Sequence, residues 1–339
     1  MTSEDVKREA MALGADAVAI GNIERWEGAP VQQDPRQIMP EAKSVISMAF
    51  RVMRGSLRGV EEGTFFSNYS AMGYGGITYL YMPLTVINLA KLFEDAGYEA
   101  IPYGHQSDWR AIDNAGDLKQ PAPARPVAPG RAVPDVMVNQ RIAAFLCGLG
   151  EIGWSKMLLT KRFGPRQRVG IVLTEAELEP DPIIEPGTLC NRCMACAKAC
   201  PVGAIPTDTS QSVKVNLGGY DVEWADIDIT ACNIGFRGAE VDDDTPDDQS
   251  YVDMKGHKTR PGWWSPFTRK PRNLYNTGQA VCGSRGCTRA CMMAMEERGV
   301  IENRFKQPFR RRRAWTVDWS QPAPDPEAGE GAASGSEAD

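Results

Sequence analysis

Eight of the nine cysteines in this chain fall into two groups whose spacing suits iron–sulfur chemistry. The first group is Cys190, Cys193, Cys196 and Cys200, followed by Pro201, in the run CNRCMACAKACP. The spacing C-x2-C-x2-C-x3-C-P is typical of bacterial ferredoxins, in which three thiolates bind one [4Fe–4S] cubane and the fourth points to another. A second set of cysteines is therefore expected, and the chain has Cys232, Cys282, Cys287 and Cys291.

Two-cluster ferredoxins share their ligands between the groups, which predicts one cluster on Cys190, Cys193, Cys196 and Cys291. The other cluster is then expected on Cys200, Cys232, Cys282 and Cys287. A structural zinc is the first alternative, but it needs only four ligands and leaves the C-x3-C-P ending unexplained. Disulfides are the second, and they do not require this regular spacing. The ninth cysteine, Cys147, lies in an apolar run and is expected to pack as a small buried hydrophobe.

Length and composition indicate a globular protein of about two domains. The chain has 339 residues, 42% of them hydrophobic, and a mean hydropathy of −0.36. No long apolar run predicts a membrane span, and the N-terminus has neither an apolar signal region nor twin arginines. We therefore expect a cytoplasmic protein, where thiolates stay reduced. The net charge of −6 disfavours nucleic acid as the main partner.

The first half of the chain alternates predicted helices and strands. Helices are expected near residues 2–14, 79–96 and 136–149, and strands near 16–20, 44–50, 98–101 and 168–174. This pattern predicts an α/β or α+β sandwich over residues 1–184. A cluster-binding domain is expected over 185–310, with an insertion at about 207–281. Residues 311–339 read as a basic run followed by a disordered acidic tail.

Several segments, in their order along the chain, resemble one superfamily. They are PEAKSVI (40–46), DAGYEAIPYG (95–104), AAFLCGLGEIG (143–153), FGPRQRVGIVLTEAELEPDP (163–182) and the ferredoxin run. Together they resemble the cobalamin-dependent reductases that include reductive dehalogenases and epoxyqueuosine reductase. The glutamate in GLGEIG and the FGPRQR segment are more similar to the dehalogenases.

This resemblance implies a fold, two kinds of cofactor and a reaction. The first domain would have a nitroreductase-like fold holding a cobalamin in its base-off form, and the second a ferredoxin-like fold with two [4Fe–4S] clusters. Reduced ferredoxin, flavodoxin or a similar donor would supply electrons, which pass through the clusters to cobalt for reductive dehalogenation of an organohalide. One alternative is reduction of a modified nucleoside in transfer RNA, which would make nucleic acid a partner. Another is a non-catalytic two-cluster electron-transfer protein.

The resemblance also suggests catalytic residues. The dehalogenases use a tyrosine as proton donor beside a cation, and Arg168 matches that arginine, with Arg166 as the nearby alternative. A surface ion pair is an equal alternative for Arg168. Tyr103 is the expected donor, while Tyr98 is expected in the core. Asn139 matches a substrate-pocket asparagine, or is simply a residue at a helix N-terminus. Three glycines would allow close approach of a cofactor or of a neighbouring helix: Gly148, Gly150 and Gly153.

Overall fold

The computed structural model describes residues 1–62, 64–65, 68–105, 126–134, 136–229, 231–232, 239–241, 251–252, 258–261, 282, 286–302 and 305–309. The tail predicted at 311–339 and much of the predicted insertion lie outside these residues. No helix in the described part of the chain is long and apolar enough to cross a membrane.

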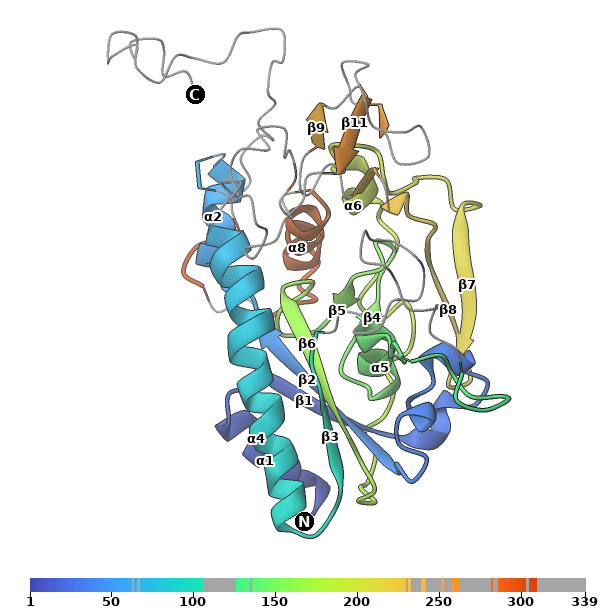
Figure 1. Cartoon of the computed structure of the whole chain (residues 1–339). Helices are drawn as coiled ribbons and strands as arrows, with labels where there is room; N and C mark the ends of the chain where they lie inside the picture. The colour runs from blue at the N-terminus through green and yellow to red at the C-terminus, as the bar shows by residue number, and fades with distance from the viewer. Residues whose placement is uncertain are drawn as a thin grey trace, which may run out of the picture.

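A four-stranded antiparallel sheet forms the centre of the first half of the chain (Figure 1). Its strands, in spatial order, are β1 (Ala17–Asn22), β2 (Ser44–Arg51), β6 (Gln167–Thr174) and β3 (Ala100–Tyr103). β2 is buried along all but its last residue because both faces of the sheet are covered. The antiparallel pairing corresponds to the α+β option of the prediction, while the nitroreductase-like assignment stays a prediction. β3 begins two residues later than expected, and Tyr98, expected in the core, is 40% exposed before it.

One face of the sheet is covered by α1 (Ser3–Ala12), α2 (Arg54–Glu62), a π-helix labelled η4 (Tyr69–Tyr81) and α4 (Met82–Asp95). In Figure 1 the long column of η4 and α4 runs beside β6 and β2. The even-numbered residues of the strands, such as Met48 and Val172, pack against Leu89 and Phe93 of α4. We call this the tyrosine face, because it contacts η4.

The helix expected over 79–96 is thus shorter, and a π-helix precedes it. Pro83 lies in the first turn of α4, where its missing amide hydrogen costs nothing. The preceding stretch contains Gly73, Gly75 and Gly76, which favour the α-helix weakly. Helices of the π type are rare and often occur at functional sites.

The opposite face is covered by α5 (Gln140–Leu146) and by a hairpin of β7 (Ser212–Leu217) and β8 (Tyr220–Ala225). Phe145 of α5 and Trp224 of β8 pack with Val45 and Ile171 of the sheet. The helix is shorter than the expected 136–149 because Asn139 caps its start. Cys147 is fully buried beyond its end, as predicted.

The cysteine-rich segment packs directly onto this sandwich. Helix α6 (Ala195–Lys198) carries Cys196, and helix α8 (Cys287–Glu297) carries Cys287 and Cys291. The two helices contact each other. Met292 of α8 and Phe309 join the core beneath the tyrosine face. The remaining short elements are η1 (Ile23–Trp26), η2 (Val31–Gln33), η3 (Pro35–Gln37), β4 (Glu151–Ile152), β5 (Leu158–Leu159), β9 (Ala239–Val241), β10 (Tyr251–Val252) and β11 (Lys258–Pro261).

Candidate functional site

Cys291, on α8, lies among three cysteines of the ferredoxin run. Burial raises the pKa of its thiol well above the ordinary value, and the nearby Cys196, Cys190 and Cys193 raise it further. Burial likewise raises the pKa of Cys196 to about 11, followed by the effect of Cys190. The tertiary fold thus brings α8 to the motif, and these four cysteines are the first predicted set.

Cys287, one turn earlier on α8, lies among different cysteines. Burial raises the pKa of its thiol to about 12, and Cys282 and Cys232 are the next causes. The pKa of Cys232 is raised by burial, then by Cys282 and Cys200. Cys200, Cys232, Cys282 and Cys287 are the second predicted set. Cys200 is thus grouped with cysteines far along the chain and not with the other three cysteines of the ferredoxin run. The assignment of each set to one cluster stays a prediction.

The chemistry of these donors fits cubane clusters. All nine cysteines are free thiols, so the disulfide alternative is wrong. Within the described residues, no three His, Cys, Asp or Glu side chains could close around a single metal ion. A cubane requires a wider arrangement than a zinc ion, because each of its thiolates binds a different iron.

The glycine-rich turn holds the start of the ferredoxin run through Glu151. This carboxylate is 3% exposed and accepts hydrogen bonds from the backbone amides of Gly187 (2.8 Å), Leu189 (2.6 Å) and Cys190 (3.3 Å). Hydrogen bonds to a charged acceptor are the stronger kind, so this buried carboxylate fixes the backbone that leads into Cys190. The sequence comparison used Glu151 only as a family feature and missed this role.

Trp154, three residues after Glu151, lies among the cysteines. Its backbone amide donates to the Cys190 sulfur at 3.3 Å, and its indole Nε1 donates to the carbonyl oxygen of Pro206 at 2.9 Å. Cys196 belongs to the same buried group of side chains as Trp154, and Cys200 packs against that group. Amide donors near a cluster sulfur are among the groups that set its reduction potential.

The three predicted glycines are packed against protein. Gly148 has φ of +82°, and a side chain on it would strike the carbonyl of Pro182. A side chain on Gly150 would strike the Leu159 carbonyl, and one on Gly153 would crowd the Leu159 side chain and approach the Cys190 sulfur. Close backbone packing therefore explains these glycines, and contact with a cofactor stays a prediction.

Arg168, on β6, lies against tyrosines of η4. Its Nη2 donates a 2.8 Å hydrogen bond to the hydroxyl of Tyr69. Its guanidinium carbon lies 4.5 Å from the centroid of the Tyr74 ring. The partners of this arginine are thus a phenol and aromatic rings, and not the carboxylate of a surface ion pair, while its catalytic role stays a prediction.

Tyr69 and Tyr74 belong to a row of tyrosines spaced five residues apart, which ends with Tyr79. In a π-helix residues five apart lie close to one another along one side, because its hydrogen bonds join residues i and i+5. The Tyr74 and Tyr79 hydroxyls are 3.2 Å apart, and His105 contacts both rings edge-on, at 6.2 and 5.2 Å between centroids. Burial and then Arg168 lower the pKa of His105. This row is the signal in the sequence that could have identified Tyr69.

Tyr103 occupies a different place from the one expected. It ends β3, is 3% exposed, and its hydroxyl accepts a hydrogen bond from the amide of Val138 at 2.8 Å. Tyr103 is paired with Ile171 of β6, and Arg168 lies three residues earlier on that strand. Side chains alternate along a strand, so Tyr103 and Arg168 point to opposite faces of the sheet. The structure therefore brings Arg168 to Tyr69 and does not bring it to Tyr103.

Arg141, in the first turn of α5, is an exposed residue whose Nη1 donates a hydrogen bond to the carbonyl oxygen of Lys156 at 2.9 Å. Desolvation by the surrounding protein lowers its pKa, although part of the residue stays exposed, and Arg168 lowers it further. Cys287, Tyr69 and Cys232 raise it.

Asn139 has a structural task and also lines a pocket. Its Oδ1 accepts hydrogen bonds from the amides of Arg141 (3.1 Å) and Ile142 (3.2 Å), as an N-cap does. The pocket beside it, of 460 Å³, lies between α5 and the β7–β8 hairpin and also contacts Lys156 and Trp224. Its role in a substrate site stays a prediction.

Two buried polar atoms near the tyrosines are left without hydrogen-bond partners in the described structure. They are Nε of Arg168 and Oγ1 of Thr78 on η4. Leaving a buried donor unpaired costs about 1–3 kcal/mol, so such atoms favour a polar ligand. The amide-bearing edge of a corrinoid, or a polar group of a substrate, would satisfy them, and the residues present therefore fit the implied cofactor.

Comparisons with known proteins agree with the motifs. A family model described as a 4Fe-4S binding domain matches residues 188–205, so the chain carries this iron–sulfur motif. Over 72 residues the chain is 42% identical to tetrachloroethene reductive dehalogenases of Desulfitobacterium hafniense and Dehalobacter restrictus. The predicted resemblance to reductive dehalogenases is confirmed. The match spans 21% of this chain and 13% of the length of these curated relatives.

Two solved structures are also similar. The catabolic reductive dehalogenase NpRdhA has a TM-score of 0.49 and 20% identity, with 88% of this chain and 35% of that chain covered. Epoxyqueuosine reductase from Streptococcus thermophilus has a TM-score of 0.37 and 16% identity, with 60% and 54% covered.

Proposed function

We propose that this chain is the reducing, catalytic part of a corrinoid- and iron–sulfur-dependent reductase that removes halide from a small organohalide. The observation that carries the proposal is the 2.8 Å hydrogen bond from Arg168 to the hydroxyl of Tyr69, in a chain that also carries the two cysteine sets. The chain thus has residues suited to supplying electrons and a residue suited to supplying a proton. The confirmed resemblance supports the reaction class, and a reduced ferredoxin or flavodoxin in the cytoplasm would be the donor.

The cysteine sets would hold two [4Fe–4S] clusters, and the residues around Arg168, Tyr74 and His105 would contact a base-off cobalamin. When bound, these groups supply single electrons and a low-valent cobalt able to reduce a carbon–halogen bond. The division of labour follows the expected domains, with residues 1–184 contacting the corrinoid and 185–310 the clusters. Glu151 and Trp154, which lie in the first expected domain, would hold Cys190 of the second domain in place through their hydrogen bonds with it.

Tyr69 would deliver the proton. Replacing a halide by hydrogen consumes two electrons and one proton and releases the halide ion. The hydroxyl of Tyr69 is oriented by Arg168, whose positive charge stabilises the negative charge that develops on the phenol oxygen as the proton leaves. The Tyr74 ring covers the guanidinium and in turn contacts Tyr79 and His105, which limits the water on that side of Arg168.

The experiment is anaerobic reconstitution with iron, sulfide and cobalamin, followed by absorption and electron paramagnetic resonance spectra and a halide-release assay. We expect about one cobalamin per chain and, for a base-off form without a histidine ligand, a cobalt(II) spectrum without nitrogen superhyperfine splitting. Halide release from a chlorinated or brominated substrate supports the proposal. Clusters without cobalamin binding would indicate an electron-transfer protein, and turnover of epoxyqueuosine-containing RNA alone would indicate the nucleoside reductase.

A further inference from the structure

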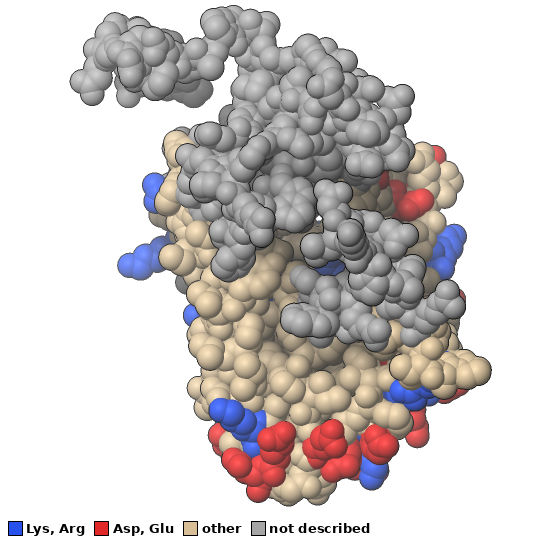
Figure 2. All heavy atoms as spheres, in the orientation of Figure 1, with Lys and Arg blue, Asp and Glu red and all other residues tan. Residues whose placement is uncertain are grey.

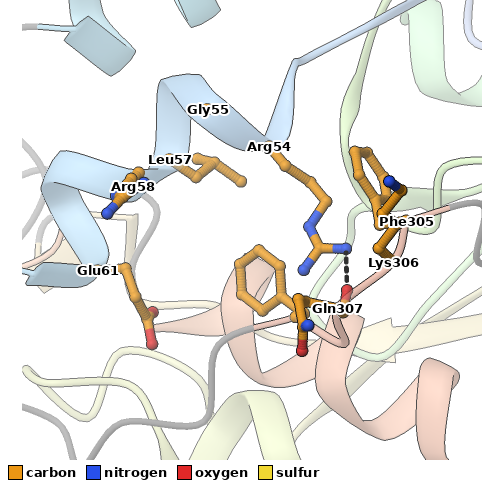
Figure 3. Close-up of a pocket in the computed structure, with 9 residues that line it drawn as sticks. Arg54, Gly55, Leu57, Arg58, Glu61, Phe305, Lys306 and Gln307 are labelled. Atoms are coloured by element: carbon orange, nitrogen blue, oxygen red, sulfur yellow. Dashed lines mark hydrogen bonds between the residues drawn. The ribbon is translucent and has the colours of Figure 1, made fainter.

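A basic surface lies over the helix that carries Cys287 and Cys291. We call it the arginine face, and it consists of Arg51, Met53, Arg54, Arg58, Phe305 and Lys306. Two pockets meet on it, one of 380 Å³ and one of 350 Å³, and both contact Arg54 and Phe305. Figure 3 shows Arg54 reaching from α2 toward Phe305 and Gln307, and its Nη1 donates to the Gln307 carbonyl at 3.2 Å.

Basic residues outnumber acidic ones on this face, although Arg51 pairs with Asp16 and Arg166 is buried. The two pockets are lined by six basic residues, Arg51, Arg54, Arg58, Arg162, Arg166 and Lys306, and by two acidic ones, Glu61 and Glu302. Glu61 is buried and paired with Arg289. The whole chain carries a net charge of −6, so the excess of basic residues on this face is opposite in sign to the charge of the whole chain. In Figure 2 basic atoms stand out at the left edge, where Figure 1 draws α2, whereas acidic atoms gather at the lower end of the molecule.

Apolar side chains lie between these charges. Phe305 is 52% exposed and Met53 is 46% exposed. The guanidinium carbon of Arg54 lies 4.2 Å from the centroid of the Phe305 ring. An exposed apolar centre within a charged rim is typical of a protein interface, because the centre supplies buried area and the rim steers the approach.

The arginine face is also close to the iron–sulfur ligands. Glu61, which lines the first pocket, pairs with Arg289, and Arg289 lies between Cys287 and Cys291 on α8. Arg54 pairs with Glu296 of the same helix at 3.9 Å. Glu296 is five residues beyond Cys291, or about 7.5 Å along the helix at 1.5 Å per residue. These ion pairs connect the arginine face to the helix that carries the two cysteines.

We propose that the arginine face docks an acidic, low-potential one-electron carrier protein of the ferredoxin or flavodoxin class. In the complex one electron leaves the reduced carrier, which is oxidised by one unit, and passes to the iron–sulfur centre that α8 helps to hold. No covalent bond forms or breaks. A negatively charged chain needs such a local basic face to attract an acidic partner, because its overall charge repels one. The inference rests on the proposed reductase function for its need of an electron donor.

The test compares two reductants on the reconstituted protein without substrate. Stopped-flow bleaching of the iron–sulfur absorbance is followed with an acidic flavodoxin in its reduced state, and separately with reduced methyl viologen, which needs no docking. The variant is Arg58→Glu with Lys306→Glu, two exposed residues outside the catalytic site. The matched control is Arg8→Glu with Lys91→Glu, two exposed residues on α1 and α4 that change the net charge equally.

We expect the face variant to lose at least about tenfold of the flavodoxin-driven rate at low salt, since electrostatic steering raises association 10- to 1,000-fold. Its flavodoxin affinity should fall in parallel, while the viologen-driven rate and the control stay unchanged. The proposal is overturned if flavodoxin fails to reduce the parent protein, if both variants slow equally, or if an RNA stem–loop binds the face more tightly than flavodoxin. A dehalogenation assay that fails while this salt-dependent reduction persists would count against the function and not against the docking face.

Discussion

Arg168 donates a 2.8 Å hydrogen bond to the Tyr69 hydroxyl from the face of the sheet opposite to Tyr103. The family's pairing of a tyrosine with a cation is thus available, but with a different tyrosine from the one that the sequence suggested. The π-helix makes this possible by placing Tyr69 and Tyr74 beside β6.

Tyr69→Phe should lower turnover by roughly 10²–10⁴-fold, the range for a lost general acid, while cobalamin and iron contents stay normal. Arg168→Leu should have a similar effect, and the double variant should be little worse than either, because both residues act on one proton. Steady-state halide release measures this. Tyr103→Phe is the control and should stay active. Loss of activity in Tyr103→Phe but not in Tyr69→Phe would restore the sequence-based assignment.

The two cysteine sets can be tested separately. The parent protein should hold about eight iron and eight sulfide, as two cubanes require. Cys291→Ser should impair the centre on Cys190, Cys193 and Cys196, whereas Cys200→Ser should impair the other one. Electron paramagnetic resonance of the reduced variants should therefore show loss of different signals. Loss of the same signal in both variants would show that the sharing scheme is wrong.

Glu151→Gln should destabilise the backbone segment that leads into Cys190. The carboxylate accepts three amide hydrogen bonds, and weakening charge-assisted bonds should lower the free energy of unfolding by about 1.5–3 kcal/mol. Hydrogen exchange should speed up at the amides of Gly187 and Leu189, and iron content should drop. The exposed Glu185→Gln is the matched control. Unchanged exchange in Glu151→Gln would contradict this role.

His105 should make stability fall on the acid side of neutrality. Partial desolvation and then the charge of Arg168 lower the pKa of His105 in the folded protein, although the residue stays partly exposed. The folded state therefore resists the proton that the unfolded state binds. Stability is therefore full above the unfolded value of 6.5 and decreases as pH falls below it. Urea midpoints at several pH values, measured anaerobically, should show this slope in the parent and a shallower slope in His105→Phe. Equal slopes would indicate that His105 does not contribute.

The sequence was sufficient for features that depend on local spacing. The ferredoxin motif fixes its cysteines within twelve residues, and the apolar runs of β2 and β6 predict strands because a strand buried on both faces needs continuous hydrophobic residues. The division of Cys291 and Cys287 between different sets was predicted from the sharing pattern of two-cluster ferredoxins, and it stays a prediction. The helix over 79–96 was placed only roughly, because a π-helix has no distinct propensity signal in a single sequence.

Which tyrosine meets Arg168 was decided only by the tertiary structure. Tyr103 is near the right place along the chain, but strand alternation in an antiparallel register sends it to the far face, and register cannot be counted from sequence when the pairing strand is distant. The buried role of Glu151 and the ion pairs that join α2 to α8 likewise depend on contacts between segments far apart in the chain. The spacing of the cysteines along the chain was enough to predict iron–sulfur ligands. Which tyrosine lies beside Arg168 depends on the face of the sheet to which each side chain points, and only the tertiary structure fixes that.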